Sequence, residues 1–218
     1  MISIEQQQKL LLSAARRLKR KITAYAIGGT SMMFLGLKDS TLDIDLVFKN
    51  KKDKDSFKEA IKSIGYHDFN PIRVYGKKEN KPEMLTLGDE RFDLFVLRVI
   101  YFIFSDAMQK RAKQIHQFDK NLILKIADPH DIILMKCATD RLKDVDDVKK
   151  IISNTKIDWN IIVKEAEKQI SLGQEKAAFE LGCFLEDLRE NMKINIPKET
   201  LDKLFKIVQK QAAEKQKK

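Results

Sequence analysis

Two aspartates separated by one residue, Asp43 and Asp45, stand in the apolar run LDIDLVF at residues 42–48. The run predicts a strand, and because alternate side chains of a strand share a face, the two carboxylates should project together while Ile44 and Leu46 face a core. Carboxylates this close repel each other unless a cation lies between them. Oxygen ligands suit Mg²⁺, which prefers one or two carboxylates together with substrate phosphates. The pair therefore predicts a magnesium site, with a solvated polar strand end as the alternative.

A glycine turn, Gly28-Gly29-Thr30, lies between a strand predicted over residues 23–27 and a short helix predicted over residues 30–37. Backbone N–H groups at a helix start are free, and the helix dipole there favours anions. Glycine lets a phosphate approach the backbone closely, and the Thr30 hydroxyl can add a further contact. The turn is interpreted as a phosphate cradle, with an ordinary tight turn as the alternative.

Together, these two features resemble the signature of the DNA polymerase β-like nucleotidyltransferase superfamily. The matching residues are Ile27-Gly28-Gly29, a gap of thirteen residues, and then Asp43-Ile44-Asp45-Leu46. The resemblance implies an α+β fold in which helices flank a mixed sheet and a helical C-terminal part follows. It also implies a third carboxylate on a later strand of the same sheet, and Asp93 in the run RFDLFVL fits that place.

The second half of the chain resembles the standalone bacterial and archaeal branch of this superfamily, which includes abortive-infection and toxin–antitoxin nucleotidyltransferases. Those proteins carry a lysine, an arginine and a Lys-Asp-x-x-Asp run on a helical segment, and this chain has Lys136, Asp140-Arg141 and an Asp144-Val-Asp-Asp147 run. The resemblance implies that Lys136 neutralises triphosphate oxygens and that Asp144 lines the nucleotide pocket, unless it pairs with Arg141 to hold the segment. A solvated helix face is the alternative for each.

The predicted elements divide the chain into a catalytic domain at residues 1–127 and a helical domain at residues 128–218. The division falls where Asp128-Pro129 forms a helix start, with aspartate as the N-cap and proline at the first helical position. Other predicted strands cover residues 72–75, 84–87, 92–97 and 122–126. Predicted helices cover residues 3–20 and 56–64, with a charged turn at 49–55, and then residues 106–113, 129–140, 145–153, 159–170, 174–192 and 198 to the tail.

The composition limits which binding partners and which cellular location we expect for the protein. The 218 residues carry a formal net charge of +10, and such a basic balance favours nucleic acid, nucleoside triphosphates or an anionic membrane face, with plain solubility as the alternative. No apolar run approaches the roughly 20 residues that span a bilayer, and the first residues lack a signal-peptide pattern. Two cysteines cannot build a disulfide framework. These features predict a cytoplasmic protein without a membrane segment.

The resemblance implies a metal-dependent nucleotidyltransferase, in which an acceptor hydroxyl attacks the α-phosphate of ATP or another nucleoside triphosphate and pyrophosphate leaves. Asp43 and Asp45 would hold two Mg²⁺ ions, while Asp93 would bind the second ion and help to deprotonate the acceptor. The acceptor would be a tRNA, another RNA or a protein. Two alternatives remain: an antitoxin-like protein that modifies and binds a partner toxin, and a non-enzymatic binding module that keeps the fold.

The proposed site has a geometric consequence. Asp93 should lie on a strand next to that of Asp43 and Asp45, with its carboxylate facing theirs across a cleft. Gly28 and Gly29 should form the rim, and Lys136 should point into the cleft. We expect all three acids to be solvent-accessible, because buried like charges without a cation are very costly.

Overall fold

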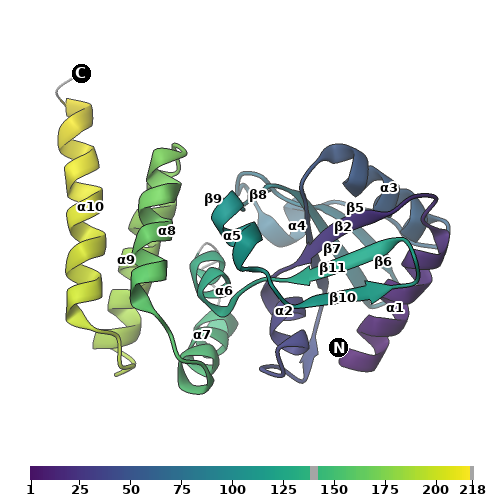
Figure 1. Cartoon of the computed structure of the whole chain (residues 1–218), viewed down its shortest axis with the longest axis horizontal. Coiled ribbons are helices and arrows are strands. Elements are labelled where there is room, and N and C mark those ends of the chain that lie inside the picture. The colour runs from purple at the N-terminus through teal and green to yellow at the C-terminus, as the bar shows by residue number, and fades with distance from the viewer. Residues whose placement is uncertain (138–141, 217–218) are drawn as a thin grey trace. The chain divides into compact units, whose positions relative to one another are not determined.

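The computed structural model describes residues 1–137 and 142–216, which form two compact units (Figure 1). Unit 1 consists of Met1–Ile100 and Met108–Asp128, and unit 2 consists of Tyr101–Ala107 and Pro129–Lys218. Unit 1 contains a mixed β-sheet flanked by helices, and unit 2 is mainly helical, so the expected α+β class is confirmed. The division into domains at residue 127 stays a prediction.

The main sheet of unit 1 combines parallel and antiparallel strands. In spatial order its strands are β10 (Ile115–Phe118), β11 (Leu122–Ile126), β2 (Ile22–Ala26), β4 (Ile44–Phe48), β7 (Glu90–Val96), β6 (Glu83–Leu87) and β5 (His67–Phe69). Strand β4 pairs antiparallel with β2 and parallel with β7, and β11 pairs parallel with β2. Strands β4 and β7 therefore lie in the middle of the sheet, where each is held by neighbours on both sides.

Two helices, α1 (Ile4–Arg17) and α3 (Lys51–Lys62), begin at polar caps. In the capping box predicted for α1, the Ser3 hydroxyl accepts a hydrogen bond from the Gln6 backbone N–H, and the Gln6 side chain accepts one from the Ser3 N–H. The Asn50 side chain caps α3 by accepting a hydrogen bond of 2.8 Å from a backbone N–H of its first turn.

One face of the sheet packs against α1 and α3. Leu11 of α1 and Phe57 of α3 share a buried cluster with Ile44 and Leu46 of β4. Because side chains alternate along a strand, Asp45, which stands between these two residues, points to the opposite face. The apolar pattern of β4 therefore decides which face of the sheet carries the carboxylates.

Two local predictions are wrong. The strand expected at residues 72–75 is a short helix, α4 (Ile72–Tyr75), because the Asn70 side chain accepts a hydrogen bond from the Ile72 N–H and folds the chain into a helical turn. The charged turn expected at residues 49–55 belongs mostly to α3, since the Asn50 cap starts that helix earlier.

The remaining elements before residue 129 are short. They are α2 (Gly28–Phe34), α5 (Asp106–Arg111), β1 (Ile2–Ser3), β3 (Ser40–Thr41), β8 (Arg98–Val99) and β9 (Phe102–Ile103). Strand β1 pairs with β3 outside the main sheet. Helix α2 directly follows β2, as expected from the glycine turn, and so places the start of α2 beside the central strands.

Unit 2 is built from the helices expected for the second half of the chain. They are α6 (Pro129–Lys136), α7 (Leu142–Asn154), α8 (Trp159–Ser171), α9 (Glu175–Glu190) and α10 (Lys198–Gln216). Helices α8, α9 and α10 pack on one another through buried side chains such as Ile162, Leu181 and Leu204. Among the described helices, none is both long enough and apolar enough to cross a membrane.

Candidate active site

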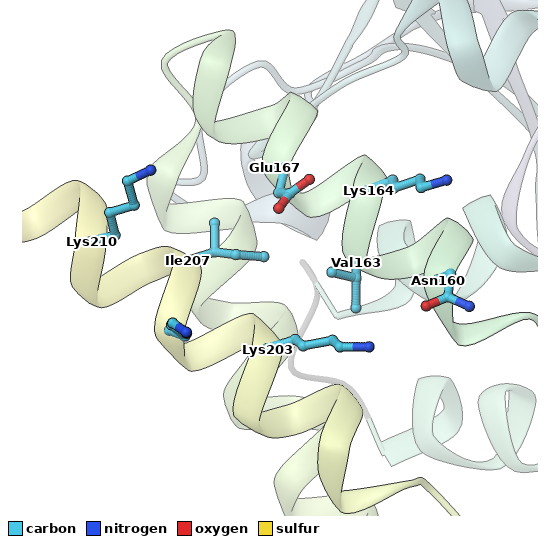
Figure 2. A pocket seen from close by; sticks show the side chains of 8 residues that line it. Asn160, Val163, Lys164, Glu167, Lys203, Ile207 and Lys210 are labelled. Carbon is cyan, nitrogen blue, oxygen red and sulfur yellow. The ribbon is translucent and has the colours of Figure 1, made fainter.

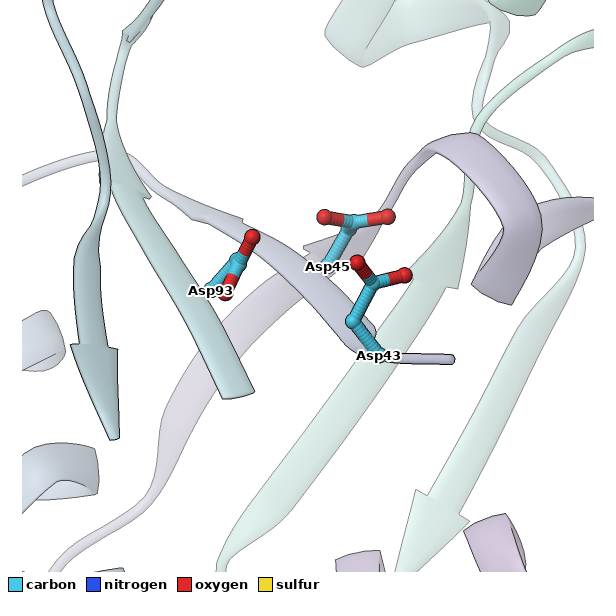
Figure 3. Close-up of side chains that lie close together, drawn as sticks. All are labelled: Asp43, Asp45 and Asp93. Carbon is cyan, nitrogen blue, oxygen red and sulfur yellow. The ribbon is translucent and has the colours of Figure 1, made fainter. Parts of the chain in front are cut away.

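The aspartates predicted from the sequence gather on one face of the sheet (Figure 3). Asp45 on β4 is directly paired with Asp93 on the parallel strand β7. One carboxylate oxygen from each of Asp43, Asp45 and Asp93 lies within 4.8 Å of the other two. The predicted position of Asp93 is therefore confirmed, although nothing yet tests its role as a ligand.

Hydrogen bonds from neighbouring threonines hold the Asp43–Asp45 segment. Asp43 directly precedes β4, and its carboxylate accepts a hydrogen bond of 3.3 Å from the Thr41 hydroxyl. The backbone N–H of Asp45 donates to the Thr30 hydroxyl oxygen over 2.9 Å. Thr30 is fully buried, so the structure gives it a positioning role at the start of the strand. Its contact with a triphosphate stays a prediction.

The two glycines let the backbone approach this segment closely. Gly28 has a positive φ of +54°, and a Cβ at this position would lie 2.7 Å from Asp45 Oδ2. A Cβ on Gly29 would lie 2.5 Å from the Thr41 hydroxyl oxygen. A side chain at either position would therefore displace Asp45 or Thr41. Phosphate binding by Gly28 and Gly29 is not tested by this geometry.

Arg91 and Tyr75 bind the aspartates, and sequence reasoning missed both. The Arg91 guanidinium forms an ion pair with Asp43, and its Nε lies 2.9 Å from Asp93 Oδ1, close enough for an ion pair but not aligned as a hydrogen bond. The Tyr75 hydroxyl donates to Asp93 Oδ2 over 2.7 Å. Arg91 could have been found, because it stands two residues before Asp93 on the same strand face. Tyr75 had no such signal, since its segment was predicted to be a strand.

The expectation that all three acids are accessible is wrong. Asp93 is fully buried and Asp43 is only 5% exposed, whereas Asp45 is partly exposed. The burial is tolerated because Arg91 supplies a cation inside the cluster and Tyr75 supplies a hydrogen-bond donor. The compensating charge inside the cluster is thus an arginine of the chain itself, where the sequence pattern had predicted only a metal ion.

The side chains present fit a divalent cation. The three carboxylates carry a formal charge of −3 and Arg91 carries +1, so the four groups together carry −2, which one divalent ion would balance. The donors toward such an ion are all carboxylate oxygens, the set that Mg²⁺ prefers. Asp45, as the most exposed of the three acids, offers the route by which an ion from solvent would enter.

In unit 2, Lys136 forms a buried charge cluster with two of the aspartates from the Lys-Asp-x-x-Asp run. Its Nζ donates to Asp144 Oδ1 over 2.6 Å and to Asp147 Oδ2 over 2.5 Å. The contacts tie the end of α6 to α7. The nucleotide-binding roles of Lys136 and Asp144 stay predictions, and Asp140 and Arg141 lie outside the described residues.

A pocket in unit 2 lies between α8 and α10 (Figure 2) and has a volume of about 420 Å³. Its lining residues are Asn160, Val163, Lys164, Glu167, Lys203, Lys206, Ile207 and Lys210. The lining is basic over an apolar floor and includes a single carboxylate. It therefore lacks the cluster of oxygen ligands that the sheet of unit 1 provides.

Comparison with protein families bears on the chemistry of the aspartate cluster. Residues 1–193 match the family described as "Nucleotidyltransferase of unknown function (DUF6036)". The chain belongs to this nucleotidyltransferase family. The match covers the aspartate cluster and most of unit 2, and it ends before α10. Membership supports the nucleotidyltransferase class at a coarse level, whereas the polymerase β-like branch stays a prediction.

A solved structure similar to this family member is described as a "putative nucleotidyltransferase from H. pylori". It is 14% identical, with a TM-score of 0.41, and the match covers 98% of this chain and 96% of the other. A likeness at this level carries no argument about the reaction. No curated protein matches the chain.

Proposed function

We propose that this member of the nucleotidyltransferase family is a metal-dependent enzyme that moves a nucleoside monophosphate from a nucleoside triphosphate to an acceptor hydroxyl. The observation that carries the proposal is the gathering of Asp43, Asp45 and Asp93 within 4.8 Å on the central strands. Three carboxylates this close together are costly, and they make chemical sense as ligands for a cation that also binds phosphate oxygens.

Asp43 and Asp45 would hold the cation, and the hydrogen bonds from Thr41 and to Thr30 keep their segment in place before substrate arrives. Two Mg²⁺ ions are expected from the superfamily resemblance. When bound, such ions neutralise triphosphate oxygens and stabilise the charge of the transfer step. The residues of the chain therefore contribute mainly position and charge.

Asp93 would accept the proton of the attacking hydroxyl. As that oxygen forms a bond to the α-phosphorus, the bond from the α-phosphorus to the bridging oxygen breaks and pyrophosphate leaves with the electron pair. Tyr75 and Arg91 fix the orientation of the Asp93 carboxylate. Arg91 has several N–H donors and can share them between carboxylates and an incoming phosphate.

A binding module without transferase activity is the second candidate, and one observation favours it. Arg91 already pairs with Asp43 and lies against Asp93, so two of the three acids have a cation without any metal. In such a module the acids and Arg91 would form a structural charge cluster. The antitoxin-like alternative stays a prediction.

Metal binding and transfer can be measured separately. Calorimetric titration with Mn²⁺ should show a site in the wild-type protein, and incubation with α-labelled nucleoside triphosphates, RNA and protein fractions should label an acceptor. Asp45→Asn keeps the side-chain volume but removes a ligand charge. We expect Mn²⁺ affinity and transfer activity each to fall by about 100-fold or more, since even groups that only orient a metal ligand contribute 10- to 100-fold.

Asp39→Asn is the matched control, because Asp39 is exposed and lies outside the cluster. It should bind Mn²⁺ and transfer nucleotides like the wild type. Full Mn²⁺ binding and full turnover in a folded Asp45→Asn protein would rule out the metal-dependent mechanism. Mn²⁺ binding without labelling of any acceptor would favour the binding module.

A further inference from the structure

A basic groove crosses the outer side of unit 1, where the end of α1 approaches the start of α3. It has a volume of about 1090 Å³. Its lining residues are Arg16, Arg17, Lys19, Arg20, Lys51, Lys52, Asp55, Ser56, Glu59, Ala60 and Ser63. Six of these side chains are basic and two are acidic, so the lining has a formal charge of +4. The groove is thus the site of a concentrated positive potential on unit 1.

Several of these cations have no carboxylate to neutralise them. Arg20 pairs with Asp53, and Lys51 pairs with Asp55. Among the described residues, no carboxylate forms an ion pair with the others, which are Arg16, Arg17, Lys19 and Lys52. All four are exposed. Their charges are therefore available to a ligand.

Helix stability explains only part of this arrangement. Arg16 and Arg17 stand in the last turn of α1, where a positive charge interacts favourably with the helix dipole. Lys51 and Lys52 stand at the start of α3, where the dipole favours acidic residues instead. Lys51 offsets this cost by pairing with Asp55 one turn later, whereas Lys52 raises the positive potential of the groove at a cost to the helix.

The groove and the aspartate cluster lie on opposite sides of the sheet. Helices α1 and α3 pack on the face that carries Ile44 and Leu46, whereas Asp45 points to the other face. A ligand in the groove therefore leaves the aspartates uncovered. Binding at the groove and chemistry at the aspartates can be varied independently.

We propose that this groove binds the phosphate backbone of a nucleic acid. The lining has no aromatic and no large apolar side chain, so it lacks the anchors that protein interfaces use and the platform on which bases stack. It also offers nothing to insert into a membrane. Repeated phosphates at regular spacing match several unneutralised cations, and contacts of this kind do not depend on base sequence.

The pocket between α8 and α10 is also basic, and it fits a nucleic acid less well. Its floor contains Val163 and Ile207, and Lys203 pairs with Glu199. The groove on unit 1 contains three arginines and a floor of small residues, Ser56, Ala60 and Ser63. Arginine binds phosphate oxygens through two parallel N–H donors, which lysine cannot do.

Fluorescence anisotropy with the full chain tests the proposal. The probes are a fluorescein-labelled RNA of about 20 nucleotides and a DNA of the same sequence, titrated at salt concentrations of about 50 to 200 mM. Lys19→Gln/Lys52→Gln removes two groove charges. If both contact phosphates, the slope of log affinity against log salt should become shallower by roughly 1.4 to 1.8, and Kd should rise about tenfold.

Two matched pairs control for the loss of net charge. Lys113→Gln/Lys120→Gln removes two exposed lysines of unit 1 outside the groove, and Lys206→Gln/Lys210→Gln removes two lysines of the α8/α10 pocket. Both should keep Kd within about twofold and leave the salt slope unchanged. If all three double variants lost the same affinity, net charge alone would explain the effect and the proposal would fail. An unchanged salt slope in Lys19→Gln/Lys52→Gln would also overturn it.

RNA and DNA arms identify the source of the phosphates. Calorimetry with Mn²⁺ separates the groove from the aspartate cluster: the groove pair should bind the ion like the wild type. Loss of RNA binding in Asp45→Asn as well would place the nucleic acid at the aspartates and overturn the groove. If a poly-glutamate peptide competed as well as RNA does, the ligand would be an acidic protein instead.

Discussion

Asp45 and Asp93 occupy directly paired positions on the neighbouring parallel strands β4 and β7, although they stand 48 positions apart in the chain. Strand pairing therefore holds two like charges side by side on one face of the sheet. Arg91, on the same face of β7, provides the cation that makes this arrangement stable without a bound ion. The stability of unit 1 and the binding of a metal should consequently be coupled.

Arg91→Gln should destabilise the protein in metal-free buffer. The substitution leaves Asp43 and Asp93 buried without their cation, and breaking a buried ion pair in this way costs about 3–5 kcal/mol. Mg²⁺ or Mn²⁺ should restore part of the loss, because a divalent ion can replace the missing charge. Thermal unfolding with and without the ion measures both effects.

Arg98→Gln is the control for this change, because Arg98 is exposed and lies near the end of β7. Its Tm should stay close to that of the wild type in both buffers. The metal ion should raise Tm more in Arg91→Gln than in the wild type. An equal or smaller rise would contradict the idea that Arg91 and the ion neutralise the same carboxylates.

Tyr75→Phe should weaken the position of the Asp93 carboxylate. It removes the hydroxyl that donates to Asp93 Oδ2 over 2.7 Å, and a hydrogen bond to a charged group contributes about 1.5–3 kcal/mol. We expect a lower free energy of unfolding in urea and slower transfer with an unchanged triphosphate Kd. Tyr101→Phe is the control, since its ring packs under Lys176 and its change removes no described hydrogen bond. Equal stability of the two variants would contradict the positioning role.

Gly28→Ala should lower the stability of the protein by more than the strain of its backbone conformation alone explains. Gly28 and Gly36 both have positive φ, at +54° and +70°, where a Cβ costs about 1–2 kcal/mol. A Cβ on Gly28 would also lie 2.7 Å from Asp45 Oδ2, whereas nothing lies within 4 Å of one on Gly36. Gly36→Ala therefore measures the conformational cost alone. The further loss of stability and of Mn²⁺ affinity in Gly28→Ala should measure the displacement of Asp45, and identical behaviour of the two variants would disprove it.

Acid should weaken a partly buried charge cluster formed by Lys54 and Lys58 with Asp68 and Glu83. Lys58 and Lys62 lower the pKa of Asp68, and Lys54 and Lys58 lower the pKa of Glu83 against the opposing effect of its burial. A carboxyl whose pKa is lowered by folding stabilises the protein above its ordinary pKa. That stabilisation is lost as pH falls through the lower value of the folded state.

In Lys58→Gln, the free energy of unfolding should therefore decrease less steeply as the pH falls below about 4.5, the ordinary pKa of a glutamate such as Glu83. Urea unfolding from pH 3 to pH 7 measures the dependence, and Lys120→Gln, an exposed lysine outside the cluster, should keep the wild-type profile. If Lys58→Gln lost stability at low pH as steeply as the wild type, other carboxyl groups would control the acid dependence.

Features that depend on near neighbours in the chain could be predicted from local patterns. The alternation around Asp43 and Asp45 predicted that they share a face, because the strand period is two. The Ser3 capping box and the helices of the second half followed from equally local patterns. The prediction failed at residues 72–75, where the Asn70 side chain competes with a strand.

The residues that lie opposite the pair depend on how the strands and helices assemble. Asp93 was expected there from the superfamily resemblance, yet its distance from Asp45 depends on strand register, which no local pattern specifies. Arg91 and Tyr75 reach the aspartates because β7 and α4 bring them to the same face. Whether a carboxylate is buried or accessible depends on all the elements that cover it, and that is why the sequence predicted exposed acids where the fold buries Asp43 and Asp93 beside an arginine.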